Sequence, residues 1–330
     1  MKSPFSMSDT APLLEGAHKI VRDCSQIQPG ERVLVITDTG RDLAIACALM
    51  QEIMAIPAEC TICIMEMRKN PGEEPPPQVH AAMLNSDVIL QATTTVMAFT
   101  RAKKEACERG ARMAAMTGIV PEILMSPALL KTDFDKELKT IEKVADKVAQ
   151  ARYAKVTTPA GTSLEMNLGG RIPDSCTSLL RTPGRLTGLP NLEVYVAPIE
   201  SSVNGVAVID GTVSSSGLVS HPITLTITNG IVKKIEGKED AKTLKRLLED
   251  QKDPHVYQVA ELGIGLNPHA QLRGAIIEDE GALGTAHIAL GDNLTFGGKN
   301  KAPVHIDMVM KDPIIWLDGK KLVEGRTLHL

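Results

Sequence analysis

The sequence is poor in aromatic residues, and this shortage excludes several kinds of ligand. Of its 330 residues only eight are Phe, Tyr or Trp. Surfaces that stack bases or dock proline-rich peptides need several rings close together. The 36 basic and 40 acidic side chains leave a net charge of −4, without the excess of positive charge that nucleic acid or an anionic membrane attracts. We therefore expect a small-molecule or short-peptide substrate, and neither nucleic acid nor membrane as a partner.

Long apolar runs and paired cysteines are also missing. No run approaches the roughly 20 apolar residues that span a bilayer, and the first residues lack the apolar core of a secretion signal. Six cysteines are scattered through apolar segments, which is typical of reduced thiols. Cys60 and Cys63 form a CxxC, but they lie in a strand-like run where side chains three apart point to opposite faces, which argues against a redox or zinc role. We expect a cytoplasmic protein.

Strand-like and helix-like segments alternate through the first 130 residues. The strand-like runs are 31–38, 59–65, 87–91 and 112–116, and helix-like segments follow the first three at 42–50, 76–85 and 98–109. This alternation is typical of a parallel sheet with helices on its faces. Only one glycine, Gly40, opens the first helix, so the phosphate-binding GxGxxG pattern is absent. We predict a Rossmann-like α/β domain over residues 1–150 that serves as a scaffold and binds no cofactor.

The composition changes after a charged, helix-periodic connector at residues 131–154. Runs rich in β-branched residues follow, separated by Gly, Pro and Asn turns, and one helix is expected over residues 239–250. The sequence thus predicts a strand-rich α+β domain over residues 151–330. Six of the eight histidines lie after residue 190, so we expect this second domain to carry a metal site.

The segment Val304-His305-Ile306-Asp307-Met308 is the first candidate for this metal site. On a strand, His305 and Asp307 at positions i and i+2 project from the same face. A histidine and a carboxylate that converge in this way often hold a divalent metal. A buried His–Asp hydrogen bond without metal explains the pair equally well.

Three further residues favour the metal. Glu193 and Glu261 each lie in an apolar strand-like run that has no Lys or Arg, and a buried carboxylate needs a cation to offset its desolvation. His287 lies among glycines and small residues, where the backbone can approach a ligand closely. Together with His305 and Asp307, these residues form a donor set suited to a pair of divalent ions that share carboxylates.

The segments around these residues resemble those of a known group of metallopeptidases. LEVYVAP with Glu193, AELGIGLNP with Glu261, GTAHIALGDN with His287 and APVHIDMVM with His305 and Asp307 are similar, in the same order, to the metal-site segments of aminopeptidases of the T and S type. The resemblance implies that these five residues bind two divalent ions, Zn, Co, Mn or Fe, which activate water to attack an amide carbonyl. It also implies a homodimer.

A second branch of the same superfamily is also similar. The 2,5-dihydroxypyridine 5,6-dioxygenases resemble this chain at residues 253–257, 263–268 and 297–307. That resemblance implies a single Fe(II) held by two His and one Asp, of which His305 and Asp307 would be two and the third would stand at Glu261.

The donor set favours one of the two branches. Because the dioxygenases lack counterparts of Glu193 and His287, it favours a metal-dependent amide or peptide hydrolase acting on a peptide or small amide metabolite. The ring-cleaving dioxygenase is the alternative, and a metal-binding protein without activity is a third reading.

Three residues are candidates for catalytic roles. Glu280, in the acidic run 278–280, could act as the general base on a metal-bound water, although a solvated turn explains that run more simply. Glu200 and His269 are candidates for contact with the substrate. No tyrosine follows Tyr257, whereas the aminopeptidases carry one after the histidine that matches His287, so a small amide is as plausible a substrate as a peptide.

Overall fold

The computed structural model describes residues 10–330, and these residues form two compact units that are interleaved along the chain. The first contains the residues up to Asp135 together with Thr177–Asn191, and the second contains Lys136–Cys176 and Leu192–Leu330. Between residues 10 and 330 no helix is long and apolar enough to cross a membrane. The expected lack of a secretion signal rests in part on residues 1–9, which lie outside the described residues.

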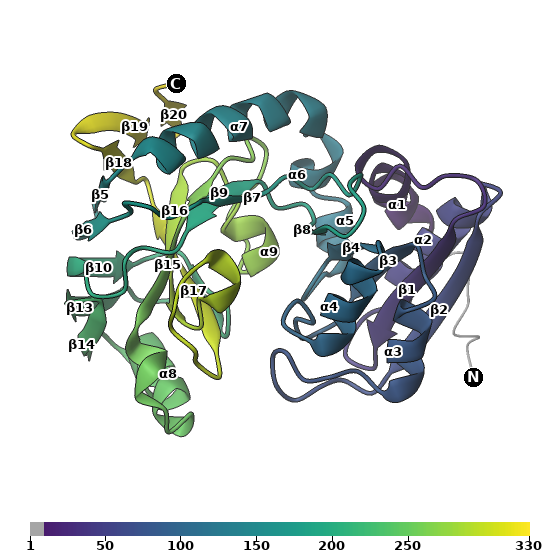
Figure 1. The fold of residues 1–330 in the computed structure, drawn as a ribbon, viewed down its shortest axis with the longest axis horizontal. Coiled ribbons are helices and arrows are strands. Elements are labelled where there is room, and N and C mark those ends of the chain that lie inside the picture. The colour runs from purple at the N-terminus through teal and green to yellow at the C-terminus, as the bar shows by residue number, and fades with distance from the viewer. Residues whose placement is uncertain (1–9) are drawn as a thin grey trace. The chain divides into compact units, whose positions relative to one another are not determined.

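The first unit is built on a five-stranded parallel sheet in the order β2-β1-β3-β4-β8 (Figure 1). Its strands are β1 (Arg32–Asp38), β2 (Glu59–Met65), β3 (Val88–Ala92), β4 (Arg112–Ala115) and β8 (Leu186–Gly188). The parallel α/β architecture predicted for the N-terminal part is confirmed. β8 was not predicted, because it is only three residues long and follows the connector helix in the chain.

Helices connect the parallel strands of the first unit and cover its sheet. They are α1 (Leu14–His18), α2 (Leu43–Met54), α3 (Pro77–Met83), α4 (Arg101–Glu108), α5 (Pro121–Leu124) and α6 (Pro127–Leu130), with short helical turns at η2 (Ala11–Leu13) and η3 (Lys19–Cys24). Asp42 and Thr100 begin α2 and α4 by accepting a backbone N–H from the first turn, at 2.9 and 3.1 Å. On one face of the sheet, Leu34 and Ile89 pack with Met83 of α3 in an aliphatic core.

The second unit contains two antiparallel sheets. The eight-stranded sheet has the order β14-β13-β10-β6-β5-β18-β19-β20, and the seven-stranded sheet has the order β12-β11-β17-β16-β15-β9-β7. The strands of the first are β5 (Tyr153–Thr157), β6 (Ser163–Asn167), β10 (Asn204–Ile209), β13 (Ile223–Thr228), β14 (Ile231–Glu236), β18 (Ile314–Leu317), β19 (Lys320–Glu324) and β20 (Thr327–Leu328). Those of the second are β7 (Asp174–Cys176), β9 (Glu193–Val196), β11 (Thr212–Val213), β12 (Gly217–Leu218), β15 (Val259–Gly265), β16 (Thr285–Gly291) and β17 (His305–Lys311). The predicted strand-rich C-terminal part is confirmed.

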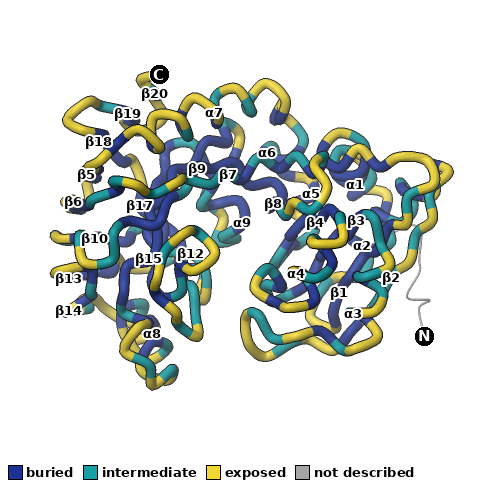
Figure 2. The backbone as a smooth tube through the Cα atoms, viewed as in Figure 1, coloured by how far each residue is buried: buried dark blue, intermediate teal, exposed yellow. Residues whose placement is uncertain are grey.

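Burial differs sharply between these two sheets. In β5 and β6 exposed and buried residues alternate, so one face of the eight-stranded sheet meets water. Every residue of β15 and β16 is buried, and β15 is dark blue in Figure 2. The seven-stranded sheet is therefore covered on both faces at its centre, where polar side chains are shielded from solvent.

Helices of the second unit are α7 (Phe134–Gln150), α8 (Glu239–Asp250) and α9 (Ile276–Asp279), with helical turns at η4 (Pro254–Tyr257) and η5 (Leu294–Phe296). The helix expected over 239–250 is present with those bounds. Ile141, Val144 and Val148 of α7 are buried at helical spacing, so this charged helix packs by one apolar stripe.

A buried arginine joins β4 to the segment that contributes β8. Arg112 Nη2 donates to both carboxylate oxygens of Glu31, at 2.6 and 2.8 Å, and Nη1 donates to the carbonyl oxygens of Ser25 and Leu180. We predict that Arg112→Ala lowers the free energy of unfolding by about 3 kcal/mol, because Glu31 loses its cation and the carbonyl oxygens of Ser25 and Leu180 lose a donor. Urea denaturation would measure this loss.

The exposed pair of Lys155 with Glu165, at 3.0 Å, is the matched control for that experiment. Lys155→Ala should change the free energy of unfolding by less than about 1 kcal/mol, since water screens an exposed pair. Equal effects of the two substitutions would contradict the role given to Arg112.

Candidate metal centre

All five predicted ligands project from one face of the seven-stranded sheet. They come from four adjacent strands, with Glu193 on β9, Glu261 on β15, His287 on β16, and both His305 and Asp307 on β17. The register places them side by side, since Gly263 of β15 pairs with His287 and Ala289 of β16 pairs with Asp307. The structure thus brings together side chains that are far apart in the sequence.

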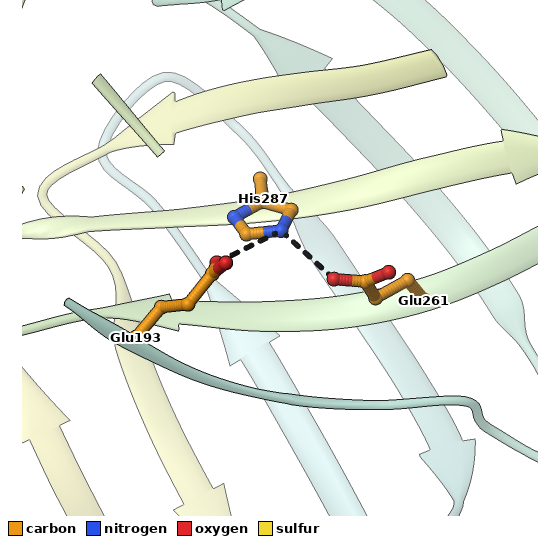
Figure 3. Close-up of side chains that lie close together, drawn as sticks. All are labelled: Glu193, Glu261 and His287. Carbon is orange, nitrogen blue, oxygen red and sulfur yellow. Dashed lines mark hydrogen bonds and ion pairs between the residues drawn. The ribbon is translucent and has the colours of Figure 1, made fainter. Parts of the chain in front are cut away.

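Glu261 lies between the two histidines. Its Oε1 is 3.2 Å from His287 Nε2, and its Oε2 is 3.3 Å from His305 Nε2. His305 Nε2 is also 3.0 Å from Asp307 Oδ1, and His287 Nε2 is 3.5 Å from Glu193 Oε2. Figure 3 shows Glu193 and Glu261 pointing toward the ring of His287 from either side. Every nitrogen and oxygen in this chain of contacts is a potential metal donor.

Two overlapping groups of donors result from this arrangement. Ligand atoms of Glu193, Glu261 and His287 lie within 4.8 Å of one another, and so do those of Glu261, His305 and Asp307. Imidazole nitrogens combined with carboxylate oxygens fit divalent ions such as zinc, iron or manganese. Because these donors are buried or nearly so, a bound cation would also offset the negative charge of the three carboxylates.

A glycine makes the position of His287 possible. A Cβ atom at Gly263, the cross-strand neighbour of His287, would lie 2.0 Å from the ring Cε1 and 2.2 Å from Nε2. The imidazole therefore lies across the backbone of β15, in the space that any side chain at this position would fill. This is how His287 reaches both Glu193 and Glu261. The sequence pattern does not predict this role of Gly263, because it depends on which residue of β15 pairs with His287.

His305 is oriented from the other side of its ring. Its Nδ1 is 2.7 Å from the backbone carbonyl oxygen of Asp292, which fixes Nδ1 as the donor and leaves Nε2 to face Glu261 and Asp307. Hydrogen bonds of this kind, in which the ring N–H donates to a backbone carbonyl oxygen, commonly orient metal-binding histidines.

The charges of the cluster shift its pKa values strongly. Burial by itself lowers the pKa of His287, but the hydrogen bond to Glu261 and the charges of Glu193 and Glu261 outweigh it and raise the pKa to about 9. Burial likewise lowers the pKa of His305, and Asp307 and Glu261 hold it well above its usual value. In Glu261, burial raises the pKa, and the hydrogen bonds from the two histidines lower it overall. Without metal, the histidines are thus held as cations between carboxylates.

Glu280 lies beside the cluster. One carboxylate oxygen of Glu280 is within 4.8 Å of ligand atoms of His287 and Asp307. Burial and the neighbouring charges of Glu193 and Asp307 raise the pKa of this carboxyl well above its usual value. The expectation of a solvated turn at 278–280 is wrong, because Glu278 and Asp279 are buried.

Hydrogen bonds explain how this acidic turn can be buried. Asp279 accepts the hydroxyl of Thr212 at 2.5 Å, and it accepts the backbone N–H groups of Arg273 and Gly274 at 2.7 Å each. The turn is therefore held against β11, and it fixes the position of the Glu280 that follows it.

The other two predicted residues have different surroundings. His269 is exposed in the turn after β15, where its backbone N–H bonds to Asn267 Oδ1 at 3.0 Å. Glu200 forms an ion pair with Arg171 at 2.5 Å and accepts the backbone N–H of Lys299 at 2.7 Å. Neither residue belongs to a donor group of the cluster within residues 10–330.

The fold and this cluster together define the class of protein. It has an α/β unit and a strand-rich unit, and the strand-rich unit carries a buried site for divalent metal. Comparison with known proteins makes this assignment more specific. Residues 15–329 match the family model described as 2,5-dihydroxypyridine 5,6-dioxygenase, and the chain belongs to this family.

A curated relative and two solved structures agree with that family. The 2,5-dihydroxypyridine 5,6-dioxygenase of Pseudomonas putida strain KT2440 is 28% identical over 215 residues, which cover 62% of this chain and 60% of that protein. The solved structure of 2,5-dihydroxypyridine dioxygenase from the same strain has a TM-score of 0.81 at 21% identity, over 96% of each chain. Wild-type AmpT from Thermus thermophilus has a TM-score of 0.69 at 17% identity, over 97% of this chain and 99% of that one. At these identities the two structures show the shared fold.

The comparisons confirm one part of the predicted resemblance and overturn another. The chain belongs to the dioxygenase family, one of the two branches that it was expected to resemble, and it shares its fold with AmpT. The expectation of an amide or peptide hydrolase, with an aminopeptidase or metalloprotease activity, is wrong, because the matching family and the curated relative are both dioxygenases. The prediction of a hydrolase relied on the donor set, but carboxylates and histidines on the same fold can serve different reactions.

We predict that Gly263→Ala lowers the free energy of unfolding by about 2 kcal/mol, because the new methyl group displaces the ring of His287. The same substitution should be neutral or slightly stabilising in a His287→Ala background, where the clash is absent. Chemical denaturation of the four proteins of this double-mutant cycle would measure the coupling. An equal cost of Gly263→Ala in both backgrounds would contradict the packing described here.

We predict that the metal-free protein becomes less stable as the pH rises from about 6.5 to 9. His287 binds its proton more tightly when folded, with a pKa of about 9 against about 6.5 in the unfolded chain. Its stabilising contribution is therefore complete below pH 6.5 and is lost as the pH rises through 9, by up to about 3 kcal/mol. Urea denaturation in the presence of a chelator at pH 6.5, 7.5 and 9 would measure the loss. His287→Asn should make the loss smaller without abolishing it, because the pKa of His305 is raised as well. Rising stability of the natural protein over this range would contradict the shift.

Proposed function

We propose that this protein is a non-haem Fe(II) dioxygenase that opens the ring of 2,5-dihydroxypyridine or a closely related hydroxylated pyridine. The observation that carries the proposal is the family match, which runs from residue 15 to residue 329 and so includes both units. The net reaction breaks the bond between ring carbons 5 and 6 and adds one oxygen atom of O₂ to each carbon. No external reductant is needed, because both oxygen atoms end in the product.

In this proposal a single iron is held by Glu261, His305 and Asp307. Their ligand atoms lie within 4.8 Å of one another, and they come from two strands that β16 separates. Fe(II) held by these three residues would supply a place for O₂ and for the substrate oxygen atoms to bind. The fixed orientation of His305 by the Asp292 carbonyl supports this assignment.

Glu261 stands where the resemblance to the dioxygenases implies a histidine, and its surroundings reduce this difference. His287 lies 3.2 Å from the carboxylate oxygen of Glu261 that faces away from His305, and its pKa is raised to about 9. An imidazole N–H at this distance would donate a charge-assisted hydrogen bond to the carboxylate and offset part of its charge. Glu261 paired with His287 thus resembles a neutral ligand more closely than an isolated glutamate does. On this view His287 and Glu193 lie around the iron ligands and tune Glu261.

Glu280 is the candidate for proton transfer. Its carboxyl group lies next to His287 and Asp307, and burial and neighbouring charges raise its pKa. A carboxyl group with a raised pKa can accept a proton from a substrate hydroxyl and hold it near neutral pH. The exposed His269 has no comparable contact with the cluster.

We predict that protein purified under anaerobic conditions contains about one iron per chain and consumes one O₂ for each 2,5-dihydroxypyridine. The loss of ultraviolet absorbance would measure the rate of substrate consumption, and an oxygen electrode would measure the rate of O₂ consumption. His305→Ala and Asp307→Ala should weaken iron binding by more than about tenfold, because each removes a ligand. Glu193→Gln should keep the iron, since Glu193 is not one of the three proposed iron ligands and its ion pair is with His287.

Glu165→Gln, the same change at an exposed residue of the eight-stranded sheet, is the control for Glu193→Gln. Two metal ions per chain, with loss of one of them in Glu193→Gln, would contradict the single-iron site. Absence of oxygen uptake by iron-loaded protein with 2,5-dihydroxypyridine would contradict the proposed reaction.

A further inference from the structure

The loop between β16 and β17, residues 292–304, is closed at its base by its own hydrogen bonds. Asp292 N–H donates to the Val304 carbonyl at 2.8 Å, and Asn293 N–H donates to the Asn300 carbonyl at 3.1 Å. The side chain of Asn300 donates to the Gly291 carbonyl at 2.7 Å. These bonds fix both ends of the loop, which also supplies the carbonyl that orients His305.

A buried ion pair holds the outer part of the same loop. Glu200 Oε1 accepts the backbone N–H of Lys299 at 2.7 Å, and its Oε2 accepts Arg171 Nη2 at 2.5 Å. Arg171 also donates through Nη1 to the carbonyl oxygen of Gly297. The side chains of Arg171 and Glu200 are 8% and 22% exposed, so this pair is well shielded from water. The loop is thus held in one conformation by charged groups from outside it.

This fixed loop carries an aromatic ring to the metal cluster. Phe296, at the end of η5, has its ring centroid 5.0 Å from that of His305, with 59° between the ring planes. The ring of Tyr195 also packs edge-on against that of Phe296, with centroids 5.5 Å apart and an interplanar angle of 86°. Tyr195 lies on the same face of β9 as Glu193, because the two residues are i and i+2 on the strand.

Core packing does not explain Phe296. None of the η5 residues is buried, and the neighbouring Leu294 is 47% exposed. The chain has only eight aromatic residues, and two of them, Tyr195 and Phe296, form this pair beside a proposed iron ligand. A partly exposed ring held rigidly next to a reactive site is available to contact a ligand bound there.

We propose that Phe296 is a specificity-determining residue that contacts the planar ring of the substrate bound at Glu261, His305 and Asp307. This inference rests on the proposed function and adds to it the residue that selects an aromatic ring. Stacked or edge-on contact between rings contributes beyond the area that it buries. Tyr195 and the Arg171–Glu200 pair are positioning elements in this view, because they hold Phe296 before the substrate arrives.

The test compares two bidentate iron ligands, aromatic catechol and non-aromatic oxalate, on anaerobic iron-loaded protein by titration calorimetry. Phe296→Leu should weaken catechol binding by about three- to tenfold and change oxalate binding by less than about twofold. Phe296→Tyr should keep the affinity for catechol, because the ring is retained. Iron content, measured in parallel, should be the same in all variants.

Tyr153→Leu is the matched control, since it removes an exposed ring from the eight-stranded sheet of the same unit. It should leave both affinities unchanged. Unchanged catechol binding in Phe296→Leu, or equal weakening of catechol and oxalate, would overturn the inference.

The outcomes also separate this inference from the proposed function. If the natural protein opens 2,5-dihydroxypyridine but Phe296→Leu has an unchanged KM and unchanged catechol affinity, the proposed function stands and the inference fails. If the natural protein does not open that ring but Phe296→Leu loses catechol selectively, the ring-binding role stands and the proposed reaction fails.

Discussion

The proposed metal site depends on the contact of one buried carboxylate with two imidazoles. Glu261 lies at the centre of a fully buried strand, and its two oxygen atoms face His287 and His305. A carboxylate at this depth is tolerated only when positive charge compensates it, either from protonated histidines or from a metal ion. The same charge balance raises the pKa values of both histidines, so His305 would have to release its proton in order to bind a metal.

The sheet supplies the rigidity that this arrangement requires. Four adjacent strands hold the donors, and a missing side chain at Gly263 leaves room for the ring of His287. Hydrogen bonds from outside the cluster complete the site, with the Asp292 carbonyl on His305 and backbone amides on Asp279. Rigid elements with supporting contacts of this kind can position metal ligands more accurately than mobile loops.

The fold alone does not determine the reaction of this protein. The fold is shared with AmpT and with the dioxygenase from Pseudomonas putida, and the family match assigns the chain to the dioxygenases. Glu193 and His287 suggested a hydrolase, because they add donors for a second metal ion. The sequence shows which donors are present, but it does not show how many ions they bind. A glutamate that pairs with a protonated histidine and a glutamate that bridges two metal ions cannot be told apart in the sequence.

Local patterns in the sequence determined where the strands lie in the chain and which side chains share one face of a strand. Alternation with a period of two placed His305 and Asp307 on one face, and apolar runs identified the strands of Glu193 and Glu261, because these properties depend only on neighbouring residues. The tertiary structure alone decided which strands are adjacent, that β8 joins the first sheet, and that the 292–304 loop brings Phe296 to His305. Those contacts join segments that are distant in the chain, and they arise from the packing of the whole fold.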